Sequence, residues 1–113
     1  MLNPLEDTEQ KALCNYLRTK KLLFFSIPNG GTRNKKEAQT LKQTGLLKGA
    51  SDLVILTDNK IIFLELKRRK GGYISREQKT FLEKVNKFDY AVGIVCYGYE
   101  DAIFQVEELT NVN

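Results

Sequence analysis

Apolar residues recur along the chain at two spacings, one typical of helices and one typical of buried strands. Helical spacing is clearest from residue 4, where Asn3 is a suitable N-cap and Pro4 a suitable first helical residue, and again after Ser75. Uninterrupted apolar runs rich in Leu, Ile, Val and Phe mark the predicted strands. The predicted elements are, in order, helix 4–18, strand 22–27, helix 35–43, strand 52–56, strand 61–67, helix 75–88, strand 90–98 and helix 99–109.

This order of elements predicts one α/β domain that spans residues 1–113. Strands with apolar residues on both sides need a cover on both sides, so we expect a four-stranded mixed sheet flanked by helices on both faces. A chain of 113 residues is long enough for one modest core. Its 42% hydrophobic and 28% charged residues are ordinary for a globular domain.

The clearest predicted hairpin turns at Asp58 and Asn59, which both tolerate the positive φ of a tight turn. With this turn, residues whose numbers add up to 117 face each other, so Asp52 lies opposite Glu65. Two carboxylates about 5 Å apart repel each other unless a cation lies between them. Alternation along the strand places Lys67 on the same face as Glu65. The hairpin therefore predicts an acidic pair, a lysine and a divalent cation at one site.

Two further polar residues lie on predicted apolar stripes. Glu9 is in the middle of the stripe of the first helix, where an unpaired buried carboxylate would be costly. Gln78 precedes the apolar residues of the third helix, near its start. We expect Glu9 to join the acidic pair, and Gln78 is a further candidate.

Each of these residues also has an ordinary explanation. Glu9 fits the first turns of a helix, where the helix dipole favours acids. Gln78 fits a capping box. Asp52 could end a loop, and Glu65 and Lys67 could form an exposed pair on a half-solvated strand. These explanations do not account for the meeting of the two acids across the predicted register.

The net charge and the absence of some residue types exclude several classes of catalytic site. The chain has 18 Lys and Arg against 14 Asp and Glu, which gives a net charge of +4 and suits a polyanionic partner without proving one. It has no histidine, which excludes histidine-containing catalytic triads and histidine-ligated zinc sites. It also has no GxxxxGK[ST] loop and no GxGxxG fingerprint, so we expect no nucleotide cofactor.

The cysteines and the apolar runs indicate a cellular location. Cys14 and Cys96 have no CxxC spacing and no recognisable signal peptide precedes them, which favours free thiols in a reducing compartment. The apolar runs are far shorter than the ~20 residues of a membrane-spanning helix. We therefore expect a cytoplasmic protein without a membrane partner.

Five stretches of the sequence resemble, in order, the virus-type replication-repair nuclease (VRR-NUC) domain of the PD-(D/E)xK nuclease superfamily. They are TEQKALCNYL around Glu9, IPNGG at 27–31, LKGASDL, LELK and SREQKTFL. Ser51 occupies the position where the superfamily motif usually has proline. The resemblance covers nearly the whole chain and implies a restriction-endonuclease-like core. The catalytic residues that it implies are Glu9, Asp52, Glu65, Lys67 and Gln78.

The resemblance further implies a metal-dependent DNA endonuclease. Mg²⁺ is the expected cofactor, with Mn²⁺ as a substitute, because both accept hard oxygen ligands. The implied metal ligands are Asp52, Glu65, the backbone carbonyl of Leu66 and, through water, Glu9. Stand-alone domains of this kind resemble phage or bacterial proteins that act as homodimers on four-way (Holliday) junctions, so branched DNA is the expected partner. The expected DNA contacts are Asn29, Arg33, Lys35, Lys36, Lys48, Arg68, Arg69 and Lys70.

Three other functions stay open at this point, and the third of them, a purely structural interaction protein, would neither cut nor bind DNA. The same site could belong to a flap nuclease, another structure-selective nuclease or a nicking enzyme, which would prefer a different DNA. The chain could instead be a non-catalytic nucleic-acid-binding module that uses only its basic clusters. That module would bind without divalent metal and would lose nothing when Asp52 is neutralised.

Overall fold

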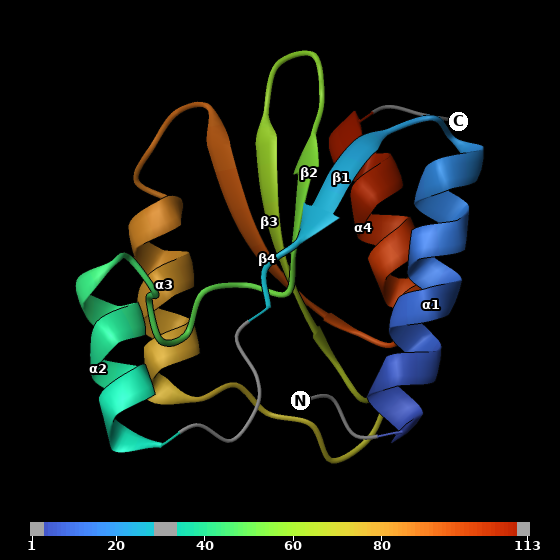
Figure 1. Cartoon of the computed structure of the whole chain (residues 1–113). Helices are drawn as coiled ribbons and strands as arrows, with labels where there is room; N and C mark the ends of the chain where they lie inside the picture. Colours follow the sequence, from blue (N-terminus) through green and yellow to red (C-terminus); the bar gives the residue numbers. More distant parts are fainter. Residues whose placement is uncertain (1–3, 29–33, 111–113) are drawn as a thin grey trace.

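The computed structural model describes residues 4–28 and 34–110, in which the predicted helices and strands occur in the predicted order (Figure 1). Asn3, Asn29 and Arg33 lie outside the described residues. Cys14 and Cys96 are free thiols, as expected. The elements are α1 (Pro4–Thr19), β1 (Leu23–Ser26), α2 (Lys35–Gln43), β2 (Leu53–Leu56), β3 (Ile61–Lys67), α3 (Arg76–Val85), β4 (Ala91–Tyr97) and α4 (Tyr99–Thr110).

The four strands form one mixed sheet in the order β1-β2-β3-β4. β2 pairs antiparallel with both β1 and β3, whereas β3 and β4 are parallel. A parallel pair needs a long connection, and here α3 crosses one face of the sheet between β3 and β4. The predicted α/β fold with a mixed four-stranded sheet is confirmed.

Helices cover the two faces of this sheet unequally (Figure 1). α1 and α4 pack on one face and bury the main core there, with fully buried side chains from both helices and from β2, β3 and β4. α3 lies on the other face, where Leu82 packs against Gly93 and the ring of Phe81 lies 5.6 Å from that of Phe63. α2 lies beside α3 and has no buried residue. The core residues are Leu13, Leu17, Leu53, Ile55, Ile62, Leu64, Leu66, Cys96, Ala102 and Val106.

The β2–β3 hairpin has the predicted turn and register. The Thr57 N–H donates to the Lys60 carbonyl at 2.9 Å, and the Thr57 hydroxyl accepts from the Lys60 N–H at 3.0 Å. These bonds close the turn between the two strands. Facing residues therefore have numbers that add up to 117, as predicted. The pairs are Leu56–Ile61, Ile55–Ile62, Val54–Phe63 and Leu53–Leu64.

The predicted end of the third helix is wrong. The apolar pattern extended this helix to residue 88, but α3 ends at Val85 and the Phe88 side chain is 53% exposed. Its ring lies 5.6 Å from the ring of Tyr90. The helix ends early because the Asn86 side chain bonds to β4: it accepts from the Gly93 N–H at 2.8 Å and donates to the Gly93 carbonyl at 3.2 Å.

Candidate active site

Asp52 and Glu65, the acidic pair, face each other at the end of the β2–β3 ladder. The last pair of that ladder is Leu53–Leu64, and the acidic pair follows directly. Asp52 Oδ2 accepts a hydrogen bond of 2.7 Å from the backbone N–H of Leu66. This bond fixes the Asp52 carboxylate against the strand that carries Glu65.

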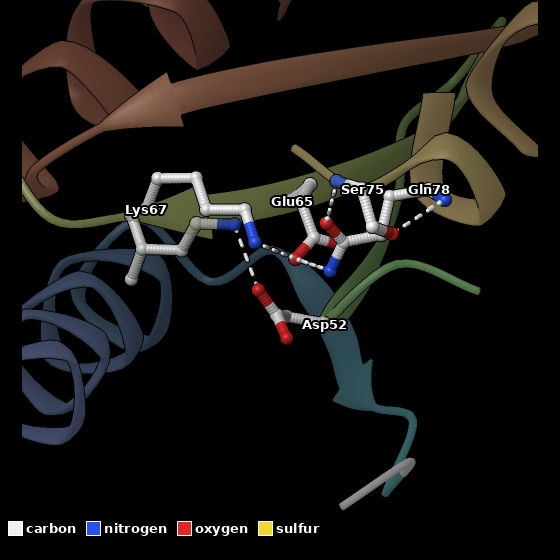
Figure 2. A network of polar contacts seen from close by, with 6 residues as sticks. Asp52, Glu65, Lys67, Ser75 and Gln78 are labelled. Carbon is white, nitrogen blue, oxygen red and sulfur yellow. Dashed lines mark hydrogen bonds and ion pairs between the residues drawn. The ribbon is translucent and has the colours of Figure 1, made fainter. Parts of the chain in front are cut away.

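Glu65 is held by two side chains, and Figure 2 shows both of them pointing at its carboxylate. Lys67 Nζ lies 3.5 Å from Glu65 Oε2, and Gln78 Nε2 donates to the same oxygen at 2.9 Å. The Glu65 side chain is only 3% exposed. Asp52, Glu65 and Lys67 thus lie in one cluster, as predicted from the hairpin, and Gln78, the further candidate, joins them.

Gln78 takes part in a capping box as well as in this cluster. Its Oε1 accepts from the Ser75 N–H at 2.9 Å, and Ser75 Oγ accepts from the Gln78 N–H at 3.1 Å. The capping box uses the oxygen of the Gln78 amide, so its nitrogen is left for Glu65. The two explanations for Gln78 therefore both hold.

Burial and the closeness of the two carboxyl groups raise the pKa values of the acidic pair. Burial, and after it the charge of Asp52, raises the pKa of Glu65 to about 8, although Lys67 acts in the opposite direction. Burial also raises the pKa of Asp52, against the effect of the hydrogen bond from Leu66. Two charged carboxylates are therefore unfavourable here, and a cation between them would remove the penalty.

The acidic pair offers ligands that suit Mg²⁺. Glu65 Oε1 is buried and accepts no hydrogen bond from the described residues. Mg²⁺ prefers hard oxygen ligands, commonly binds through one or two carboxylates and keeps several waters. Within residues 4–28 and 34–110, no group of three or more His, Cys, Asp or Glu side chains could hold a metal. Two carboxylates, with water and backbone oxygens, would therefore form the coordination shell.

Glu9 is buried, as its position on the helix indicated, but its contacts form a second cluster. Its Oε1 accepts from Arg69 Nε at 3.2 Å, and its Oε2 accepts from the backbone N–H of Tyr99, the first residue of α4. Arg69 also pairs with Glu100 at 2.6 Å. This cluster joins α1, the segment after β3 and the N-terminus of α4. A role for Glu9 as a metal ligand through water stays a prediction.

α1 carries another carboxylate that acts on the acidic pair. Glu6 lies one helical turn before Glu9, and its negative charge is one of the smaller causes, after burial, that raise the pKa of Asp52. Glu6 was not among the site residues predicted from the sequence. Its spacing of three residues from Glu9 places it on the same side of the helix, and this was the available signal.

The predicted DNA contacts lie in three parts of the described chain. Two lysines begin α2, one lies in the loop before β2, and the others follow β3. Arg69 is 49% exposed, and its guanidinium is shared by Glu9 and Glu100. Arg68 is partly buried. Among the predicted DNA contacts, the exposed lysines are Lys35, Lys36, Lys48 and Lys70.

The site thus consists of two facing carboxylates and a lysine on the central strands of a small mixed sheet. No family model and no curated protein matches the sequence. Among solved structures, a chain described as a VRR_NUC domain protein matches 100% of this chain and 93% of its own length, with a TM-score of 0.80 and 20% sequence identity. The chain therefore has the VRR-NUC fold, as the sequence resemblance implied. In its described part, no helix has the length and apolar character to cross a membrane.

Proposed function

We propose that this protein is a metal-dependent DNA endonuclease that hydrolyses phosphodiester bonds in branched DNA and resolves four-way junctions as a homodimer. The cluster of Asp52, Glu65 and Lys67 carries this proposal. It combines two facing carboxylates, a buried carboxylate oxygen without a hydrogen-bond partner among the described residues, and an amine 3.5 Å from Glu65. The likeness to a VRR_NUC domain protein supports a nuclease function in general.

Asp52 and Glu65 would hold Mg²⁺, or Mn²⁺ in its place, together with the backbone carbonyl of Leu66. The bound ion supplies Lewis-acid stabilisation of phosphate charge and lowers the pKa of the attacking water. Lys67 would orient this water and balance negative charge at the phosphate, since its amine lies 3.5 Å from Glu65 Oε2. Gln78 would keep the Glu65 carboxylate in position through its amide.

The two glutamates of α1 would have different tasks. Glu6 lies on the same side of α1 as Glu9 and its negative charge raises the pKa of Asp52, so a cation bound at Asp52 would also be attracted by Glu6. Glu9 already pairs with Arg69 and bonds to Tyr99, so we assign to it the positioning of the segment after β3 and of α4.

Junction resolution needs DNA contacts and a second site. The lysines of α2 and of the segments flanking the hairpin would contact phosphates, which predicts binding that weakens steeply with salt. A symmetric four-way junction needs two coordinated cuts, whereas the chain has one acidic pair. A two-fold homodimer would supply the second site.

The test is cleavage of a labelled four-way junction beside a flap and a linear duplex of matched sequence, in Mg²⁺, Mn²⁺ or EDTA. Asp52→Asn is the informative variant, because it removes the charge and still offers an oxygen to the Leu66 N–H. Asp58→Asn is its matched control, with the same chemical change in the exposed turn of the same hairpin. Paired symmetric cuts that need metal and disappear only with Asp52→Asn would support the proposal.

The other outcomes separate the alternatives. Metal-dependent cutting of the flap or the linear duplex in preference to the junction would overturn junction resolution and leave the endonuclease. Binding of DNA without cutting in any metal would overturn the enzyme and leave a nucleic-acid-binding module.

A further inference from the structure

An exposed tyrosine lies beside Lys67 and has no part in the proposed chemistry. β3 and β4 are parallel, and their register pairs Lys67 with Tyr97, so both side chains project from the same face of the sheet. The Tyr97 side chain is 42% exposed. Its backbone is held on both sides: the Tyr97 N–H donates to Asp101 at 2.8 Å, and the Gly98 N–H donates to the Lys67 carbonyl at 2.9 Å.

A second exposed tyrosine lies in the loop between β3 and α3, next in sequence to a residue that lies against Lys67. This loop folds back onto the strand, so that a Cβ built on Gly72 would lie only 3.0 Å from the Lys67 Cβ. The next residue is Tyr73, which is 82% exposed. The capping box of Ser75 anchors the end of the loop. The sheet thus pairs Tyr97 with Lys67, and the loop places Tyr73 one residue after the glycine that lies against the same lysine.

Large aromatic side chains beside a phosphate-binding site suit the bases of a nucleic acid. Aromatic rings bind bases by stacking, largely without sequence preference. Adjacent strands are about 4.8 Å apart, so the ring of Tyr97 on β4 lies within reach of a nucleotide whose phosphate is bound beside Lys67. Isolated exposed aromatics are common on protein surfaces. Tyr97 differs from that case because it is paired with Lys67 in the sheet, and Tyr73 because it follows the glycine that lies against Lys67.

We infer that Tyr97, assisted by Tyr73, forms a stacking subsite for a base with an exposed face next to the phosphate that is cut. The inference rests on the proposed nuclease function and deepens it, because it names the kind of DNA that the site accepts. A continuous duplex keeps its bases stacked on each other and offers no free face to these rings. Stacking is interrupted at a branch point and at the foot of a flap, so the subsite selects DNA in which the base at the cut has lost a stacking neighbour.

The experiment places the fluorescent base 2-aminopurine in the unpaired arm of a flap, next to the branch, and measures binding in EDTA. The variants are Tyr97→Leu and Tyr97→Phe, with Tyr90→Leu as the matched control. Tyr90 is 57% exposed and lies just before β4, at the opposite end of that strand from Tyr97. The same proteins are then compared in Mg²⁺ for KM and kcat on the flap and on the linear duplex, and their thermal unfolding is recorded.

Tyr97→Leu should lose the quenching of 2-aminopurine and weaken flap binding by about 5- to 100-fold, the usual contribution of one stacked base. Its KM for the flap should rise in proportion, with a smaller change in kcat and little change on the duplex. Tyr97→Phe should keep the wild-type values, because the ring is retained. Tyr90→Leu should also match the wild type.

Wild-type quenching and flap affinity in a folded Tyr97→Leu protein would overturn the subsite while leaving the endonuclease intact. A wild type that cuts no DNA would overturn the proposed function, yet loss of quenching in EDTA with Tyr97→Leu would still support the subsite. If Tyr97→Leu does not fold, Tyr73→Leu is measured in its place, because the Tyr73 side chain is 82% exposed. Unchanged quenching with Tyr73→Leu would then overturn the inference.

Discussion

Replacement of Glu65 by glutamine should stabilise the metal-free protein at alkaline pH while abolishing cleavage. The Glu65 side chain is 3% exposed, and burial followed by the charge of Asp52 raises its pKa from 4.5 to about 8. A carboxyl group with a raised pKa stabilises the fold in its protonated form. Its contribution is complete below pH 4.5 and is lost as the pH rises through about 8. The wild type in EDTA should therefore lose stability across this window.

The size of the effect follows from the same pKa values. The difference between 4.5 and about 8 corresponds to about 5 kcal/mol of unfolding free energy, at roughly 1.4 kcal/mol per pH unit. This is an upper limit, because Asp52 titrates together with Glu65 and the site relaxes when one member changes. We expect Glu65→Gln to be more stable than the wild type by about 2 kcal/mol at pH 8.5, and the advantage to vanish below pH 4.5.

The measurement is urea unfolding in EDTA at several pH values for the wild type, Glu65→Gln and the control Glu83→Gln on the exposed side of α3. Mg²⁺ added at pH 8.5 should stabilise the wild type and Glu83→Gln, but not Glu65→Gln, because binding to the folded state alone raises stability. Parallel pH profiles for the wild type and Glu65→Gln, or a less stable Glu65→Gln at pH 8.5, would refute the reasoning.

Four further variants test other contacts. Gly98 has a φ of 90°, and a Cβ there would lie 2.6 Å from Arg69 Cγ, so Gly98→Ala should cost more than about 1 kcal/mol in urea unfolding; an unchanged midpoint would contradict this. Ser75→Ala removes the N-cap of α3 and should lower the free energy of unfolding by about 1 kcal/mol and also reduce kcat. An unchanged kcat would show that this cap has no connection with the site. Glu6→Gln should reduce the cleavage rate with little effect on the free energy of unfolding, whereas Glu9→Gln should mainly lower the free energy of unfolding. If the two variants change cleavage and stability alike, their assigned roles are contradicted.

The sequence alone determined the hairpin and with it most of the candidate site. A two-residue turn between apolar runs sets the register of the whole ladder, because side chains alternate and a slip by one residue would turn the core outward. The positions of Asp52, Glu65 and Lys67 therefore followed from local chemistry. The capping box of Ser75 and Gln78 was also readable, since both partners lie within one helical turn.

Tertiary structure decided which segments complete that site. The Gln78 amide reaches Glu65 only because α3 packs on the sheet, and Glu9 finds Arg69 only because α1, β3 and α4 meet at one end of the fold. The position of Tyr97 beside Lys67 depends in the same way on the parallel pairing of β3 with β4. Such contacts join residues far apart in the chain, and their geometry depends on how the elements pack. A pattern along the sequence records spacing within an element, but it does not record these angles and distances between elements.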